Sequence, residues 1–431
     1  MQEKKDGFVD ISSRSDKTGN EVTFRKVPPR NIKPPRKNSG IKKMGIIAAI
    51  IVLLCGSVAV AAMSGMLSSP KTEANADDNI SQSESIPEES TKTADESSEE
   101  ESTPLYEPTG KFTVDNNVFE KSLRQVLNQE VTAKYVVLYD ATSDKIIFQR
   151  NANKKCYPAS TTKMLTAIVA SKIIPKDTVI TVGDEISLIG FDSSTAGLQT
   201  GMKMTFEALL DALLLPSGND AAYTIAVNAA RIYTGNDKLS NEEAVKTFME
   251  LVNEAAKEIG CTGTHYVTPD GWHDDDHYTT ATDLAKIAAY ARTVPIVKAS
   301  CGKAEAEWEL IQDSDTDDSD SSDLSDNDDD TDGDEVSLPA SMYWYNSNAM
   351  LQVGSGSYSK YCDGMKTGFT DEAGTSVVAS AEMDGHTFIA VVMFGETLYK
   401  KYEDANILFA EGFKLYNLNY TYGTDSANDT E

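Results

Sequence analysis

The sequence predicts an α+β domain in which strands from its two ends meet in one antiparallel sheet. Strand patterns rich in β-branched and aromatic residues lie near both ends of the domain, at 131–139, 145–149, 364–367, 374–382 and 386–394. Apolar residues recur with helical spacing between these strands and after them, at 160–172, 205–215, 221–233, 241–259, 282–292 and 403–415. The polar residues 140–144 are expected to form the turn that joins the first two strands.

The uneven distribution of charge sets the expected limits of this domain. The 431 residues carry a net charge of −29, yet residues 1–43 hold twelve Lys or Arg against five Asp or Glu. Residues 313–335 contain thirteen acidic residues and no basic one. Composition predicts a basic tail at 1–43 and an acidic linker at 68–113. It also predicts one domain at 114–418, with a disordered acidic insertion at 305–336, and a polar tail at 419–431. Without clustered Lys or Arg on the domain, no nucleic-acid partner is expected.

Residues 44–67 are predicted to form a single transmembrane helix that anchors the chain in the cell membrane. They carry no charge and are long enough to cross a hydrocarbon core of about 30 Å. The basic residues before them favour the cytoplasm, so the domain that follows is expected outside the cell. A cleaved signal peptide is the alternative, because Ala59-Val60-Ala61 resembles a cleavage site. Both interpretations export the domain.

Ser160 and Lys163 open the first predicted helix, in the stretch YPASTTK at 157–163. The two residues are one turn apart, so their side chains lie on the same face. A serine hydroxyl needs an adjacent base to act as a nucleophile, and a lysine is such a base when burial or a second cation lowers its pKa. The helix N-terminus also offers N–H groups to an oxyanion. Alone the motif is weak, because a capping Ser followed by a surface Lys is a common arrangement.

Two more short motifs follow in the order that completes such a site. The stretch SGN at 217–219 lies between two predicted helices, as an exposed loop does. The stretch KTG at 366–368 starts a predicted strand, where the glycine lets a substrate backbone approach closely. Ser-x-x-Lys, Ser-x-Asn and Lys-Thr-Gly in this order are typical of the penicillin-recognising serine acyltransferases, and three such matches make coincidence improbable.

From about residue 114 to 418 the chain resembles the low-molecular-weight penicillin-binding proteins, the D-alanyl-D-alanine carboxypeptidase family. Further stretches that fit this family are SGNDAA, TPDGW, HYTTA, NSN and DGMKTGFT, at 217–222, 268–272, 277–281, 346–348 and 363–370. The family often has Asn-Pro-x-Gly-Leu where this chain has TPDGW. The resemblance implies the penicillin-binding, β-lactamase-like transpeptidase fold, an antiparallel sheet with a helical subdomain.

The resemblance also implies an activity, that of a serine-type carboxypeptidase that removes the terminal D-alanine of peptidoglycan stem peptides through an acyl-enzyme. In this pattern Ser160 attacks the peptide carbonyl, Lys163 takes its proton, and Ser217 relays a proton to the leaving amine. The residues implied in substrate binding are Asn219, Lys366, Thr367, Gly368, Phe369 and Thr370. The backbone N–H groups of Ser160 and Phe369 would form the oxyanion hole. The implied partners are a peptidoglycan pentapeptide as substrate and β-lactams as inhibitors, with no cofactor and no metal.

Three other functions stay open on the same motifs: a β-lactamase, a penicillin-binding scaffold or sensor with little turnover, and a DD-endopeptidase. No clear Glu-containing loop of the kind that deacylates β-lactams follows the SGN motif, which favours the carboxypeptidase. The stretches 273–277 and 328–333 invite a metal ion, but their spacing fits no standard site, and a polar loop and an acidic insertion are expected there. The cysteines outside residues 44–67 show no CxxC spacing, so their pairing is left open.

Overall fold

The computed structural model describes residues 14–15, 21–22, 104–312 and 338–423. The predicted transmembrane helix at 44–67 and the acidic run at 313–335 lie outside these residues, as does the 68–103 part of the predicted linker. Among the described helices, none is both long enough and apolar enough to cross a membrane.

A six-stranded sheet forms the centre of the domain, in the order β10-β11-β12-β4-β5-β3. Its strands are β3 (Thr113–Val114), β4 (Tyr135–Asp140), β5 (Lys145–Arg150), β10 (Cys362–Thr370), β11 (Gly374–Met383) and β12 (His386–Gly395). Neighbouring strands are antiparallel except β3 and β5, which pair in parallel over two residues. Strand β12 lies beside β4, with Phe388 opposite Asp140, so the predicted meeting of the terminal strands is confirmed.

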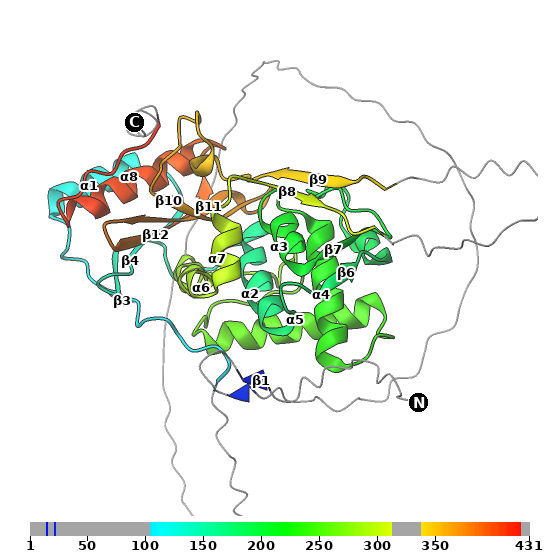
Figure 1. Ribbon diagram of the computed structural model, residues 1–431. Helices are drawn as coiled ribbons and strands as arrows, with labels where there is room; N and C mark the ends of the chain where they lie inside the picture. Colours follow the sequence, from blue (N-terminus) through cyan, green and yellow to red (C-terminus); the bar gives the residue numbers. More distant parts are fainter. Residues whose placement is uncertain (1–13, 16–20, 23–103, 313–337, 424–431) are drawn as a thin grey trace, which may run out of the picture. The chain divides into compact units, whose positions relative to one another are not determined.

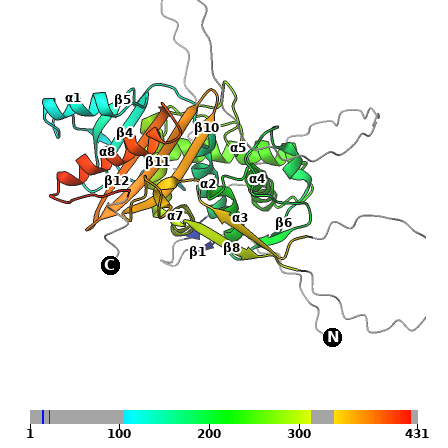
Figure 2. The ribbon, with the colours of Figure 1, turned by 90° about the horizontal axis from the view of Figure 1, so that it is seen from above.

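Helices cover both faces of this sheet (Figures 1 and 2). Helices α1 (Lys121–Glu130) and α8 (Lys400–Lys414) pack on one face around an apolar cluster that includes Leu127 and Phe409. The helices on the other face are α2 (Lys163–Ile173), α3 (Phe206–Leu214), α4 (Asn219–Thr234), α5 (Asn241–Glu258), α6 (Ala281–Thr293) and α7 (Pro295–Gly302). They form a second, larger apolar core, which is the predicted helical subdomain.

Short elements complete the domain. The two-stranded ribbons are β1 (Arg14–Ser15) with β2 (Glu21–Val22), β6 (Val179–Thr181) with β7 (Lys203–Thr205), and β8 (Glu305–Glu309) with β9 (Ser341–Tyr345). The 3-10 turns are η1 (Ala159–Thr162), η2 (Asp184–Leu188) and η3 (Ala349–Leu351). The sequence patterns did not predict α1, α7 or these ribbons.

The folded chain is longer than the predicted 114–418. Tyr106 is buried, and its backbone N–H donates to Glu258 Oε2 at 2.9 Å. At the other end, Tyr420 is buried and its hydroxyl donates to Asn406 Oδ1 at 2.7 Å. The expected disordered insertion at 305–336 also begins too early, because residues 305–309 form β8. In this strand Ala306 and Trp308 point inward between exposed glutamates, so an acidic composition conceals a half-buried strand.

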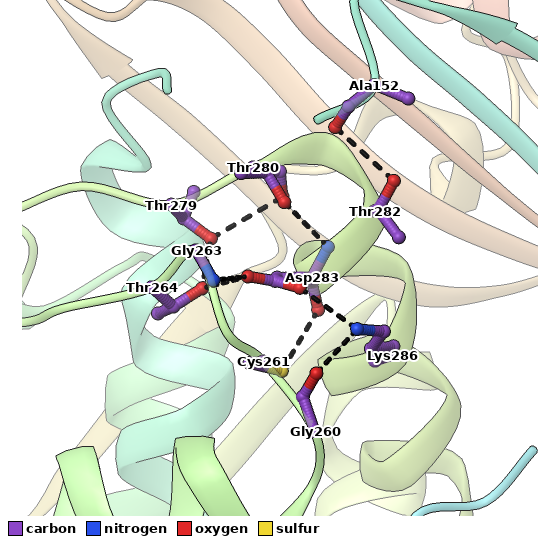
Figure 3. Close-up of polar contacts among 10 residues, drawn as sticks. All are labelled: Ala152, Gly260, Cys261, Gly263, Thr264, Thr279, Thr280, Thr282, Asp283 and Lys286. Atoms are coloured by element: carbon purple, nitrogen blue, oxygen red, sulfur yellow. Dashed lines mark hydrogen bonds and ion pairs between the residues drawn. The ribbon is translucent and has the colours of Figure 1, made fainter. Parts of the chain in front are cut away.

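A buried carboxylate, that of Asp283, holds the start of α6 to the loop that precedes it (Figure 3). Its Oδ2 accepts hydrogen bonds from Gly263 N at 2.7 Å and Thr264 Oγ1 at 3.0 Å. Its Oδ1 pairs with Lys286 Nζ at 3.2 Å. The Thr280 hydroxyl accepts from Asp283 N at 3.1 Å and caps the helix. These contacts fasten both ends of the 263–280 loop, which carries part of the site described below.

We expect Asp283→Ala to lower the free energy of unfolding by about 3 kcal/mol, because the partly buried Gly263 N–H, Thr264 hydroxyl and Lys286 ammonium all lose the carboxylate that they share. Urea denaturation followed by circular dichroism measures the change. Asp177→Ala, which removes an exposed carboxylate, is the control and should leave the midpoint unchanged. A loss below about 1 kcal/mol for Asp283→Ala would show that the loop is held by its apolar packing instead.

Candidate active site

The segment that carries Ser160 is a tight 3-10 turn, η1, directly before α2. The predicted helix therefore begins with a tighter turn than expected. The Thr162 hydroxyl donates to Ala159 O at 2.8 Å, and the Thr161 hydroxyl donates to Pro158 O at 2.7 Å. Ala159 has a φ of +48°, a left-handed conformation that is strained for a residue with a side chain. The turn thus holds Ser160 in one position by local hydrogen bonds.

Lys163 lies fully buried beneath Ser160, and its ammonium nitrogen has three oxygen partners. Lys163 Nζ is 3.1 Å from Ser160 Oγ, 2.7 Å from Asn219 Oδ1 and 2.8 Å from Asp270 O. The amide and carbonyl oxygens can only accept, so they occupy both N–H groups of a neutral amine. The remaining lone pair then faces the Ser160 hydroxyl. Burial lowers the pKa of Lys163 to about 8, so the neutral amine is available near physiological pH.

The SGN motif forms the loop between α3 and α4. Asn219 opens α4, and its Nδ2 donates to Ser193 Oγ at 3.0 Å while its Oδ1 holds Lys163. Ser217 has a φ of +68° and is largely buried. Within the described residues its hydroxyl has no protein partner, which leaves it free for a bound group.

The KTG motif lies in β10, an edge strand of the sheet. A Cβ on Gly368 would lie 3.0 Å from Pro158 O, so the missing side chain lets the strand approach the nucleophile turn. Thr367 Oγ1 is 2.7 Å from Ser347 Oγ. Phe369 is 56% exposed, and Thr370 Oγ1 accepts from Ala373 N at 3.0 Å, so that hydroxyl supports the β10–β11 turn.

A second buried lysine, Lys366, lies within electrostatic range of Lys163, and a third, Lys401, lies within range of Lys366. Lys366 and Lys401 are 1% and 5% exposed. Burial lowers the pKa of Lys366 well below its ordinary value, and the charges of Lys163 and Lys401 add to this effect. Burial lowers the pKa of Lys401 to about 8. In the part of the chain that the structure describes, none of these three lysines forms an ion pair with a carboxylate, so their surroundings favour a bound anion.

The 263–280 loop brings Asp270, Gly271 and His277 against this group. A Cβ on Gly271 would lie 1.9 Å from Ala159 O, so the loop backbone touches the nucleophile turn. His277 is buried, and its Nδ1 accepts from the N–H groups of Val267 and Thr268. The other ring nitrogen, Nε2, therefore carries the proton and donates to Thr162 Oγ1 at 2.8 Å. Burial lowers the pKa of His277 to about 3, so the ring stays neutral.

Contacts in the structure join Ser160, Lys163 and Asn219 directly, and the Lys163 charge reaches Lys366. Asp270, His277 and Lys401 were not predicted for the site. Asp270 and His277 lie in loop stretches that resemble the family but contain no predicted site residue. Lys401 lies in a helix with other charged residues, and only its burial distinguishes it.

Within the described residues, no group of His, Cys, Asp and Glu side chains is arranged to bind a metal ion. In the 273–277 stretch, both ring nitrogens of His277 already have protein partners. The candidate stretch at 328–333 lies outside the described residues. The cysteines at 156, 261, 301 and 362 are buried and unpaired.

The fold is that of the penicillin-binding DD-peptidases, as predicted. The crystal structure of the Streptomyces K15 DD-transpeptidase aligns with a TM-score of 0.55 at 25% identity and covers 66% of this chain and 98% of that one. The structure of the D-alanyl-D-alanine carboxypeptidase DacD from Francisella tularensis aligns with a TM-score of 0.50 at 27% identity, over 64% of this chain and 69% of that one.

The chain belongs to the D-alanyl-D-alanine carboxypeptidase family, whose sequence profile matches residues 121–315 and 329–397. It is 28% identical over 297 residues to the D-alanyl-D-alanine carboxypeptidase DacA of Escherichia coli K12. This alignment covers 67% of this chain and 62% of DacA. It is 27% identical over 295 residues to DacF of Bacillus subtilis 168, covering 67% of this chain and 64% of DacF. The matched part thus spans just under two thirds of the length of these relatives.

Proposed function

We propose that this chain is a serine D-alanyl-D-alanine carboxypeptidase that removes the terminal D-alanine from peptidoglycan stem peptides. The observation that carries this proposal is a serine that the buried Lys163 can deprotonate, with a second buried lysine, Lys366, that has no carboxylate partner within the described residues. A peptide that ends in a free carboxylate supplies the missing negative charge. Membership of the family supports the same reaction.

In acylation, Ser160 Oγ bonds to the carbonyl carbon of the penultimate D-alanine. The hydroxyl proton passes to the lone pair of Lys163, which Asn219 and the Asp270 carbonyl orient. The developing oxyanion accepts hydrogen bonds from the backbone N–H groups of Ser160 and Phe369. The free hydroxyl of Ser217 then relays the proton to the amine of the leaving D-alanine.

Substrate binding uses the edge of β10 and the cations behind it. An extended peptide can add to this edge strand at Gly368 and Phe369, because Gly368 carries no side chain on the side of the nucleophile turn. Its terminal carboxylate meets Lys366 and the Thr367 hydroxyl, with Lys401 as a second cation. A bound carboxylate should raise the pKa of these lysines, so that they regain the proton that burial disfavours. Thr370 shapes the adjoining turn.

Water then hydrolyses the acyl-enzyme and restores Ser160. β-Lactams carry a carboxylate and a strained amide in the same relative positions as the carboxylate and the scissile amide of the peptide substrate, so they acylate Ser160 and act as inhibitors. No cofactor enters either step.

The chain is placed in the cell membrane by a single span at 44–67, with this domain outside the cell. The uncharged composition of this segment and the basic residues before it support this placement.

The test follows D-alanine release from a diacyl-Lys-D-Ala-D-Ala peptide by the full-length protein and its Ser160→Ala variant. Release by the wild type that disappears in the variant is the expected result. Penicillin labelling without release would assign the chain to the scaffold or endopeptidase alternatives. Release that persists in Ser160→Ala would overturn the assignment of the nucleophile.

A further inference from the structure

The carboxylate of Asp270 is buried near Lys163, and in the part of the chain that the structure describes it forms no ion pair. Asp270 is 1% exposed. Its Oδ1 accepts from Trp272 N at 3.0 Å, while its Oδ2 is buried without any hydrogen-bond partner. Within the described residues, no Lys, Arg or His nitrogen lies within 4 Å of it. A buried, half-satisfied carboxylate is costly for stability, so its position calls for a functional explanation.

The backbone of the same residue is fixed directly on the lysine. Lys163 Nζ donates to Asp270 O at 2.8 Å, and the neighbouring carbonyl, Pro269 O, accepts from Thr166 Oγ1 at 2.7 Å. Gly271 is packed against the nucleophile turn. The carboxylate therefore keeps a fixed place relative to Lys163 and cannot swing into solvent.

We propose that the Asp270 carboxylate is the counter-charge for the Lys163 ammonium that forms when Ser160 is deprotonated. This inference rests on the proposed function and adds a third, positioning residue to the serine and lysine. The proton moves from Ser160 Oγ to Lys163 Nζ as Oγ bonds to the carbonyl carbon, and it later leaves for the amine of the departing group. Asp270 gains and loses no proton in these steps. It stabilises the positive charge that Lys163 holds between them.

Electrostatics support this arrangement. Burial lowers the pKa of Lys163, and among the charges that oppose this effect Asp270 acts most strongly, ahead of Asp220. Burial, and after it the Asp270 charge, raise the pKa of Tyr223, which lies one turn after Asn219 in α4. The titratable and charged groups that face Lys163 from the packed elements are Asp220, Tyr223, Asp270, His277 and Lys366. The Asp220 carboxylate already accepts hydrogen bonds from the backbone N–H groups of Ala196 and Leu198.

Asp270→Asn tests the proposal because it removes the charge and keeps an acceptor for Trp272 N and the carbonyl that holds Lys163. The rate of acylation of the full-length protein by a fluorescent penicillin is measured against pH. Without the carboxylate the pKa of Lys163 falls, so the acid limb of the profile should move down by about one pH unit. The plateau rate should fall by about tenfold, because the ammonium is less stabilised.

The controls separate charge from structure. Asp276→Asn removes an exposed carboxylate from the same loop and should leave the limb in place. Asp270→Ser removes the same charge and replaces Asp270→Asn if that variant does not fold. An acid limb that stays at the wild-type pH, whether or not the rate falls, would overturn the proposal. Penicillin acylation does not require D-alanine release, so failure of the carboxypeptidase assignment would be visible separately, in the wild type.

Discussion

Lys163→Met is expected to abolish rapid acylation by penicillin while the protein stays folded. Methionine fills nearly the same buried volume without a base, so Ser160 keeps its position and loses its proton acceptor. Loss of a general base costs about 10⁴-fold in rate. Stopped-flow acylation by a fluorescent penicillin measures the effect, and thermal unfolding checks the fold.

Lys172→Met is a matched control, because it makes the same change at an exposed position of α2. Its acylation rate should equal that of the wild type. In the wild type, the rate should rise with pH through about 8, because Lys163 accepts a proton only after losing its own. A Lys163→Met variant that acylates within tenfold of the wild type would show that another group deprotonates Ser160.

The sheet and the motif residues could be predicted because local patterns determine them. Strands β11 and β12 are continuous buried runs because helices cover both faces of the sheet, and the helix after Ser160, α2, is buried around nearly its whole circumference. Strands β12 and β4 are neighbours in the centre of the sheet, where both bury their apolar residues. Within a short motif the spacing alone fixes which side chains are neighbours. Lys163 follows Ser160 by three positions, about one helical turn, and this places the two side chains together.

The remaining parts of the site depend on contacts between distant segments. Nothing near Asp270 indicates that its carbonyl meets Lys163, which is 107 positions away. His277 looks like one more polar residue in an acidic loop, yet its ring is buried between that loop and Thr162. Lys401 follows another lysine in a charged helix, and only packing against the sheet buries it. Burial of polar side chains is a tertiary property that local patterns do not record.

Gly271→Ala is expected to disrupt the site from a position that takes no part in proton transfer. The φ of Gly271 is +88°, and an added Cβ would lie 1.9 Å from Ala159 O. Either the loop or the nucleophile turn has to shift, and each shift moves a partner of Lys163. We expect acylation to slow by about 10²-fold, the cost of a misplacement of about 1 Å. The free energy of unfolding should fall by about 3 kcal/mol.

Gly354→Ala separates the two causes of this effect. The φ of Gly354 is +89°, nearly that of Gly271, but an added Cβ would meet no atom within 4 Å. It should therefore cost about 1 kcal/mol from backbone strain alone and leave acylation unchanged. If the two variants lose equal stability and both acylate at the wild-type rate, the contact between Gly271 and Ala159 does not position Ser160. If only Gly271→Ala acylates slowly, the geometry of the serine and lysine is maintained from the 263–280 loop as well as from α2.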